Sequence, residues 1–124
     1  MIRDILHKTA IENGFNFRTG FKEEIIEHTL SFPLLWFEEP EISIKNGNTN
    51  LCTCKINGYI IDADYGNNNF SDLTDSVFNI LESIKSSPQL LKLNNIKVTA
   101  NKYPLTNFGD ISLNFSLELT IINS

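Results

Sequence analysis

A chain of 124 residues with 41% hydrophobic residues can bury a core, and its formal net charge of -5 argues against nucleic-acid binding. The ten basic residues are scattered, and no apolar run approaches the roughly 20 residues that span a bilayer. The charged N-terminus lacks the apolar region of a signal peptide. We therefore expect one soluble domain over residues 1–124, kept in a cytoplasm, with no nucleic-acid or membrane partner.

The two cysteines favour buried free thiols over a disulfide or a metal site. At i, i+2 on a strand, Cys52 and Cys54 would lie on one face about 6–7 Å apart, which disfavours a bond between them. A zinc site needs about four ligands, and only His7 and His28 could join the two thiols. No cofactor and no metal is predicted.

The N-terminal segment predicts a helix over residues 1–13, followed by a short strand. Its apolar stripe at helical spacing consists of Ile2, Ile5, Leu6, Thr9 and Ala10. Gly14 can take the left-handed conformation that ends a helix. Phe15 and Phe17 then alternate with polar residues, which is typical of a strand.

The next segment is less clear, because residues 21–30 fit a helix, a strand or an irregular loop, and all three stay open. Residues 34–44 are rich in apolar side chains and contain Pro40, which cannot donate a ladder hydrogen bond. This proline indicates an edge, a bulge or a bend between two short strands. Asn46-Gly47 then marks a turn.

A strand is expected from residue 51 to about residue 64, and it contains a second Asn-Gly pair at Asn57-Gly58. This pair predicts either a tight hairpin or a bulge that bends one long strand. We favour the bulge, because the arm after the pair (residues 59–61) is short. Residues 65–69 form a polar loop.

The middle of the chain predicts a second helix, which Ser71 or Asp72 would cap. Its stripe consists of Leu73, Val77, Ile80, Leu81 and Ile84. Ser86-Ser87-Pro88 ends this helix, residues 89–93 add a short helical turn, and residues 96–102 form a strand.

The last segment has the clearest pattern of the chain. Six apolar residues alternate with polar ones, which indicates a strand with one buried face: Ile111, Leu113, Phe115, Leu117, Leu119 and Ile121. The order of elements predicts an α+β fold. In this fold a mainly antiparallel or mixed sheet carries the N-terminal helix and one mid-chain helix on one face.

The sequence predicts no catalytic residue. Asp62 and Asp64 have the Asp-x-Asp form that can hold Mg²⁺ or Mn²⁺, but a solvated strand end explains the pair better. His7 and His28 read as surface histidines. Adjacent glutamates such as Glu38-Glu39 read as solubility features, since nothing links them to a pocket.

Two features suggest a protein interface. Trp36 and Phe37 lie in an aromatic run that is either a buried strand or an apolar patch covered by a partner, and we favour the buried strand. The outward face of the last strand is long and nearly uncharged, which suits burial against another copy of the chain. The interface residues on this strand are Ser112, Asn114, Ser116 and Thr120.

The order of elements resembles that of small tail-terminator and tail-completion proteins of tailed phages. The likeness rests on residues 32–40 (FPLLWFEEP), similar to a segment in phage and prophage proteins of Bacteroidetes type, and on residues 103–110 (YPLTNFGD) before the final strand. The resemblance implies a non-enzymatic virion protein that assembles in the bacterial host cytoplasm. Such subunits form a ring, commonly a hexamer, at the head-proximal end of the tail, where tail-tube and head-connector proteins are the partners.

Two other functions stay open. One is a small acidic protein-binding module, chaperone-like or immunity-like, whose charge suits a basic partner. The other is a metal-dependent enzyme that uses Asp62 and Asp64.

Overall fold

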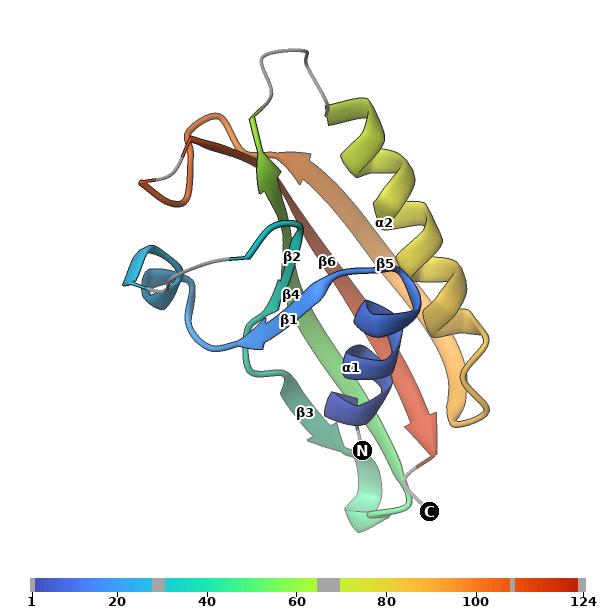
Figure 1. Cartoon of the computed structure of the whole chain (residues 1–124). Helices are drawn as coiled ribbons and strands as arrows, with labels where there is room; N and C mark the ends of the chain where they lie inside the picture. The colour runs from blue at the N-terminus through green and yellow to red at the C-terminus, as the bar shows by residue number, and fades with distance from the viewer. Residues whose placement is uncertain (1, 28–30, 65–69, 108, 123–124) are drawn as a thin grey trace.

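A computed structural model describes residues 2–27, 31–64, 70–107 and 109–122 and confirms the α+β class (Figure 1). The helices are α1 (Ile2–Glu12) and α2 (Phe70–Lys85), with the 3-10 helices η1 (Lys22–Glu27) and η2 (Lys45–Gly47). The strands are β1 (Asn16–Thr19), β2 (Leu34–Phe37), β3 (Glu41–Ile44), β4 (Leu51–Ala63), β5 (Leu90–Ala100) and β6 (Asp110–Ile122).

The six strands form one mixed sheet, in which five follow the order β1-β2-β4-β6-β5 and β3 pairs with β4 outside this path. Only the β1–β2 pair among the described strands is parallel, and the other pairs are antiparallel. On the edge of β4 opposite β6, residues 52–55 pair with β3 and residues 58–61 pair with β2. The break between β2 and β3 contains Pro40, as its missing N–H predicts.

The long central strand β4 is neither folded into a hairpin nor bulged at Asn57-Gly58, so both sequence-based alternatives are wrong. It pairs with β6 without a register shift from Leu51 opposite Ile122 to Ala63 opposite Asp110. Gly58 instead makes room for aromatic rings. A Cβ atom there would lie 2.6 Å from Cζ of Phe115 and 2.9 Å from Cε1 of Phe37.

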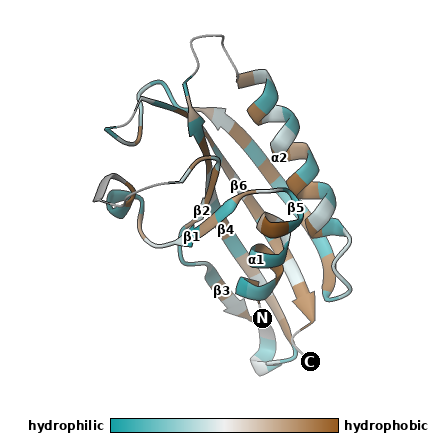
Figure 2. Cartoon of the chain, viewed as in Figure 1, coloured by the Kyte–Doolittle hydropathy of each residue, from teal (hydrophilic) through white to brown (hydrophobic). Residues whose placement is uncertain are grey.

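Both helices lie on the same face of the sheet, which we call the helix face (Figure 1). Their buried residues are those that the apolar spacing predicts, and hydrophilic segments are visible along both helices in Figure 2. Ile11 on α1 and Phe78 on α2 are apolar but exposed. They pack on alternate residues of β4 and β6, including Cys54, Ile60 and Phe115. The ring of Phe37 meets that of Phe115 edge-on, with centroids 5.7 Å apart.

The opposite face, which we call the open face, carries a smaller apolar cluster at one end of the sheet. Its buried members are Ile25, Leu34, Trp36, Tyr59 and Ile61. Ile25 reaches the cluster from η1, and Leu105 packs against it from the connection between β5 and β6. The indole Nε1 of Trp36 donates a hydrogen bond to the carbonyl of Gly20 at 3.0 Å, which ties the start of η1 to the sheet.

Three local predictions meet different outcomes. Residues 22–27 are the 3-10 helix η1, while residues 28–30 and the polar loop 65–69 lie outside the described residues. Ser71 and Asp72 do not cap α2, because the helix already includes Phe70. The expected helical turn at 89–93 is wrong, since β5 begins at Leu90 and pairs with β6 there.

The turn and cap glycines follow the prediction. Gly14 has a φ of 74° at the end of α1, and Asn46 and Gly47 have φ values of 55° and 68°. Along the described part of the chain, no helix is both long and apolar enough to cross a membrane.

Candidate functional site

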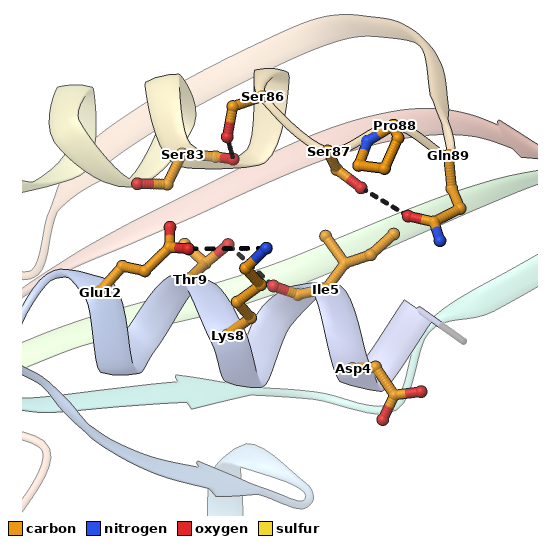
Figure 3. Close-up of a pocket in the computed structure, with 10 residues that line it drawn as sticks. All are labelled: Asp4, Ile5, Lys8, Thr9, Glu12, Ser83, Ser86, Ser87, Pro88 and Gln89. Atoms are coloured by element: carbon orange, nitrogen blue, oxygen red, sulfur yellow. Dashed lines mark hydrogen bonds and ion pairs between the residues drawn. The ribbon is translucent and has the colours of Figure 1, made fainter.

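A groove runs between α1 and α2 on the outer side of the helix layer. Small polar residues occupy the positions where the two helices approach, so the helices leave a hollow of about 370 Å³ (Figure 3). Its lining consists of Asp4, Ile5, Lys8, Thr9, Glu12, Ser83, Ser86, Ser87, Pro88 and Gln89. Lys8 and Glu12 extend from α1 toward α2, whereas Asp4 points away from the other lining residues in Figure 3.

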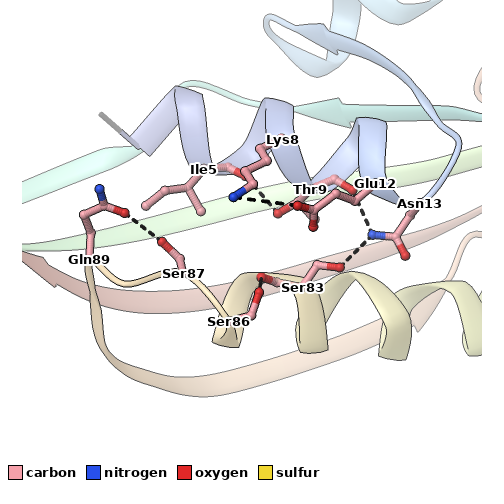
Figure 4. Close-up of polar contacts among 9 residues, drawn as sticks. All are labelled: Ile5, Lys8, Thr9, Glu12, Asn13, Ser83, Ser86, Ser87 and Gln89. Atoms are coloured by element: carbon pink, nitrogen blue, oxygen red, sulfur yellow. Dashed lines mark hydrogen bonds and ion pairs between the residues drawn. The ribbon is translucent and has the colours of Figure 1, made fainter.

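Hydrogen bonds hold the floor of this groove in place (Figure 4). The amide Nδ2 of Asn13 donates to the backbone carbonyl of Thr9 at 2.8 Å and to Oγ of Ser83 at 2.9 Å, which joins the two helices. The hydroxyl of Thr9 donates to the carbonyl of Ile5 at 2.8 Å. At the C-terminal end of α2, Oγ of Ser86 donates a hydrogen bond to the backbone carbonyl of Ser83 at 2.7 Å.

The groove supplies hydroxyl, amide and charged groups. The ammonium of Lys8 lies 3.8 Å from a carboxylate oxygen of Glu12, and both side chains are largely exposed. Ser87 donates from its hydroxyl to Oε1 of Gln89 at 3.0 Å. Among the described lining residues there is no histidine, the commonest general base for a serine or threonine hydroxyl. The lining is therefore polar and hydrogen-bonding in character, with one ion pair between its own residues.

A second hollow of about 430 Å³ lies on the open face and is acidic. Its charged and amide lining consists of Glu38, Glu39, Glu41, Lys55, Asn57, Asn95 and Glu118. Glu38 accepts hydrogen bonds from Nδ2 of Asn57 at 3.3 Å and from the hydroxyl of Tyr59 at 3.5 Å. Burial, and then the charge of Glu38, raises the pKa of Tyr59 from 10.0 to about 12.

Two edge strands of the sheet, β3 and β5, are the third candidate; β1, which pairs with β2, is the other described strand with a single strand neighbour. β5 pairs with β6 alone among the described strands, and β3 pairs with β4 alone. Both strands are largely exposed and carry aliphatic side chains. On β5, Leu91, Ile96 and Val98 are 55%, 42% and 41% exposed, and on β3 Ile42 and Ile44 are 52% and 51% exposed.

The interface residues expected from the sequence fall into two groups. Trp36 and Phe37 are fully buried within the chain, which confirms the favoured interpretation of a buried strand. The alternative of an apolar surface patch is wrong for these two residues. Ser112 is also buried, and its Oγ accepts a hydrogen bond from Nδ2 of Asn101 at 2.8 Å. Asn114, Ser116 and Thr120 are half-buried on the open face. Asn114 donates from Nδ2 to the carbonyl of Gly58 at 3.0 Å.

The cysteines are free and buried, as predicted. Burial, and then the neighbouring Cys52, raises the pKa of Cys54 from 9.0 to about 11. The thiol therefore stays protonated at neutral pH, in the form that neither attacks a substrate nor binds a metal.

Asp62 and His7 have local partners. A carboxylate oxygen of Asp62 accepts a hydrogen bond from the N–H of Ala63 at 2.8 Å, and the ring of His7 lies 5.1 Å from that of Phe17. His28 lies outside the described residues. Where side chains are described, no three His, Cys, Asp or Glu residues gather as a metal site would require.

The groove and the β5 edge are the features that sequence reasoning missed. The groove depends on which two helices lie side by side, and this is decided by contacts between distant residues. The edge had a local signal, because Leu90, Leu91, Leu93, Ile96 and Val98 make the segment as apolar as a strand. No model of a known protein family matches the chain, and no curated protein shows significant sequence similarity to it.

Proposed function

We propose that this chain is a non-enzymatic structural subunit that assembles with copies of itself, as a tail-terminator or tail-completion protein at the head-proximal end of a phage tail. Its partners would be further copies in a ring, the tail tube and the head connector, and its place would be the virion. The observation that carries the proposal is the free edge of β5. Eleven residues of strand, about 36 Å at 3.3 Å per residue, lie unpaired on one side among the described strands.

An edge of this length is unusual for a chain that works alone. Strands average about 5–6 residues, and natural proteins shorten or cover their free edges because unpaired N–H and C=O groups recruit other strands. The three exposed aliphatic side chains on β5 add apolar area that a partner can bury. The likeness of residues 32–40 to a phage-protein segment supports the same function. Asn114, Ser116 and Thr120 on the open face remain candidates for a second contact in the assembly.

The genes beside this one provide the test of the phage function. Genes for capsid, portal and tape-measure proteins in the same cluster are the expected result. A neighbourhood of metabolic or secretion genes would overturn the proposal. Replacing Asn114 with Lys then tests the open face: we expect a folded chain whose ring is lost if this face is a contact.

A small acidic binding module is the second candidate, and the acidic hollow on the open face favours it. Glu38, Glu39, Glu41 and Glu118 surround this hollow with Lys55 as its one cationic side chain among the described residues. Such a surface suits a basic partner. The test is binding of a polylysine peptide to the chain. Binding that weakens with salt and in the Glu38→Gln/Glu118→Gln variant, together with a chain that stays monomeric, would support this function over ring assembly.

A further inference from the structure

We propose that the free edge of β5 in one copy pairs with the free edge of β3 in the next copy, so that the sheet continues from molecule to molecule. The inference rests on the proposed self-assembly and names the two surfaces that would make the contact. Both strands offer unpaired backbone groups on one side, since neither has a second strand neighbour within the described parts of the chain. The charges and the side-chain faces of the two edges make a second copy of this chain the occupant of each edge.

The charges of the two edges are complementary. β5 carries Lys92 and Lys97, both exposed, and contains no acidic residue. β3 begins with the exposed Glu41, and the exposed Glu39 lies just before it. Opposite charges placed across neighbouring strands stabilise the pair, whereas like charges destabilise it.

The faces of the two strands also match. Residues paired across strands share a face of the sheet. Lys92 and Lys97 lie opposite Thr120 and Ser116 of β6, and therefore on the open face. Glu41 lies opposite Lys55 of β4, which is itself opposite Glu118, so Glu41 is on the open face as well.

The apolar residues match on the other face. Ile42 and Ile44 lie opposite the buried Cys54 and Cys52, which places them on the helix face. Val98 lies opposite the buried Phe115 and is on the helix face too. A continued sheet with the helices on one side thus brings aliphatic residues together on the helix face and lysines beside glutamates on the open face.

Pairing of β5 with β5 of another copy is the obvious competitor, and the charges oppose it. A two-fold axis perpendicular to the sheet would place four lysines along one seam with no carboxylate from either strand. Lysines also protect free edges against aggregation. Protection against aggregation does not explain the exposed aliphatic residues on both edges. Aliphatic side chains on a free edge promote the aggregation that lysines prevent.

A β5-to-β3 contact is heterologous, which means that two different surfaces of the same chain meet. Contacts of this kind close into rings or extend as filaments. β3 has four residues, so the ladder between copies is short. We therefore expect association that depends on protein concentration and weakens as salt is raised.

A charge exchange tests the proposal. The first variant carries Lys92→Glu and Lys97→Glu on β5. The second carries Glu41→Gln and Ser43→Lys on β3; Ser43 lies opposite the uncharged Thr53, which avoids a new lysine beside Lys55. The first variant places carboxylates on both edges, and the second removes the one carboxylate within β3 and adds a lysine that faces the lysines of β5. The dissociation constant of each variant should rise about tenfold or more. Mixing the two variants restores opposite charges at every contact, so assembly should return.

Analytical ultracentrifugation of the wild type, each variant and their mixture gives the result. A control with Lys85→Glu and Lys102→Glu has the same net charge as the first variant but leaves both edges intact, and it should assemble as the wild type does. Circular dichroism confirms that each variant is folded.

Three results would overturn the proposal. In the first, the wild type assembles and both variants do too, which leaves self-assembly standing through another surface. In the second, the wild type is monomeric at every concentration. This result removes the contact between edges, while the phage function is still decided by the neighbouring genes. In the third, a monomeric wild type binds a glutamate-rich strand peptide and loses it with Lys92→Glu/Lys97→Glu, which assigns the edge to a different partner.

Discussion

On the helix face, α1 and α2 cover β2, β4 and β6 with two continuous helices and bury most of the apolar side chains of the chain. On the open face, the apolar cluster around Trp36 is covered by η1 and by the connection between β5 and β6. The rest of this face carries polar side chains such as Asn114 and Glu118, which are half-buried.

The two faces are therefore stabilised by different physics. A helix brings its own backbone hydrogen bonds, so the helix face holds its cover in place mainly through buried apolar area. A loop brings few such bonds, and the open-face cover is fixed by polar anchors instead. One anchor is the bond from Trp36 to Gly20, and another is the buried carboxylate of Asp110.

The largest expected effect comes from removing a ring on the helix face. Phe115→Ala should lower the free energy of unfolding by about 3–5 kcal/mol, because it deletes a fully buried ring that packs on Gly58 of β4 and on the ring of Phe37. Val98 lies opposite Phe115 in the β5–β6 pair and is 41% exposed. Val98→Ala should therefore lower the free energy of unfolding by less than about 1 kcal/mol. Urea unfolding measures both. Equal losses would mean that the β5 edge is as tightly packed as the centre of the sheet.

Alkaline pH compares the two faces in one experiment, since Cys54 is buried on the helix face and Tyr59 on the open face. Burial raises the pKa of Cys54 from 9.0 to about 11 and that of Tyr59 from 10.0 to about 12. Between each pair of values the unfolded chain releases a proton that the folded chain keeps. Stability therefore falls as pH rises, by about 1.4 kcal/mol per pH unit for each group.

The measurement is the urea midpoint from pH 8 to pH 11. We expect a decline that starts near pH 9.0 and steepens above pH 10.0, where Tyr59 adds its contribution. Tyr59→Phe should remove the steeper part and leave the decline due to Cys54. A midpoint that does not change up to pH 11 would show that both groups ionise as readily in the folded chain as in the unfolded one.

Asp110→Asn tests the polar anchor of the open face. The carboxylate accepts hydrogen bonds from the N–H groups of Leu105 and Thr106, both at 2.9 Å, and from the hydroxyl of Thr106. An amide offers one acceptor oxygen in place of two, so at least one donor loses its partner at a cost of about 1–3 kcal/mol. The change should also loosen Leu105 from the cluster.

Fluorescence makes this effect visible, because Trp36 is the sole tryptophan of the chain. We expect its emission to shift to longer wavelength in Asp110→Asn, since water gains access to the cluster. Asp75→Asn on the exposed side of α2 is the matched control and should leave the spectrum unchanged. A shift in neither variant would show that Leu105 keeps its place without the carboxylate.

The helix face could be predicted from the sequence, and the open face could not. The buried stripes of α1 and α2 and the alternation of β6 are local patterns that repeat every 3.6 or two residues, so they could be predicted from the sequence. The start of β6 is the exception, because Ser112, expected on the outward face, is buried and Ile111 is half-buried. The open-face cluster contains residues as far apart in the sequence as Ile25 and Leu105. No local sequence pattern predicts contacts between such distant segments.

The errors in the predicted elements have the same cause. Asn57-Gly58 has the sequence of a turn, yet Gly58 is needed inside a strand because two rings from β2 and β6 approach its backbone. Residues 89–93 lack alternation because β5 has a register irregularity between Leu90 and Lys92. The favoured interpretation of Trp36 and Phe37 as a buried strand is confirmed, and the alternative that they form an interface patch is wrong. The groove between the helices depends on how they pack together.

The smallest expected effect belongs to the polar bond that joins α1 to α2. Asn13→Ala removes a donor to both Ser83 and the Thr9 carbonyl, and should cost about 1 kcal/mol. Ser83→Ala removes one of these bonds and should cost less. The double variant should then lose less than the sum of the two, with a coupling of about 0.5–1 kcal/mol. Ser71→Ala on the exposed first turn of α2 is the control and should be additive with Asn13→Ala. Additive losses for Asn13 and Ser83 would mean that their hydrogen bond contributes nothing and that apolar packing on the sheet holds the two helices together.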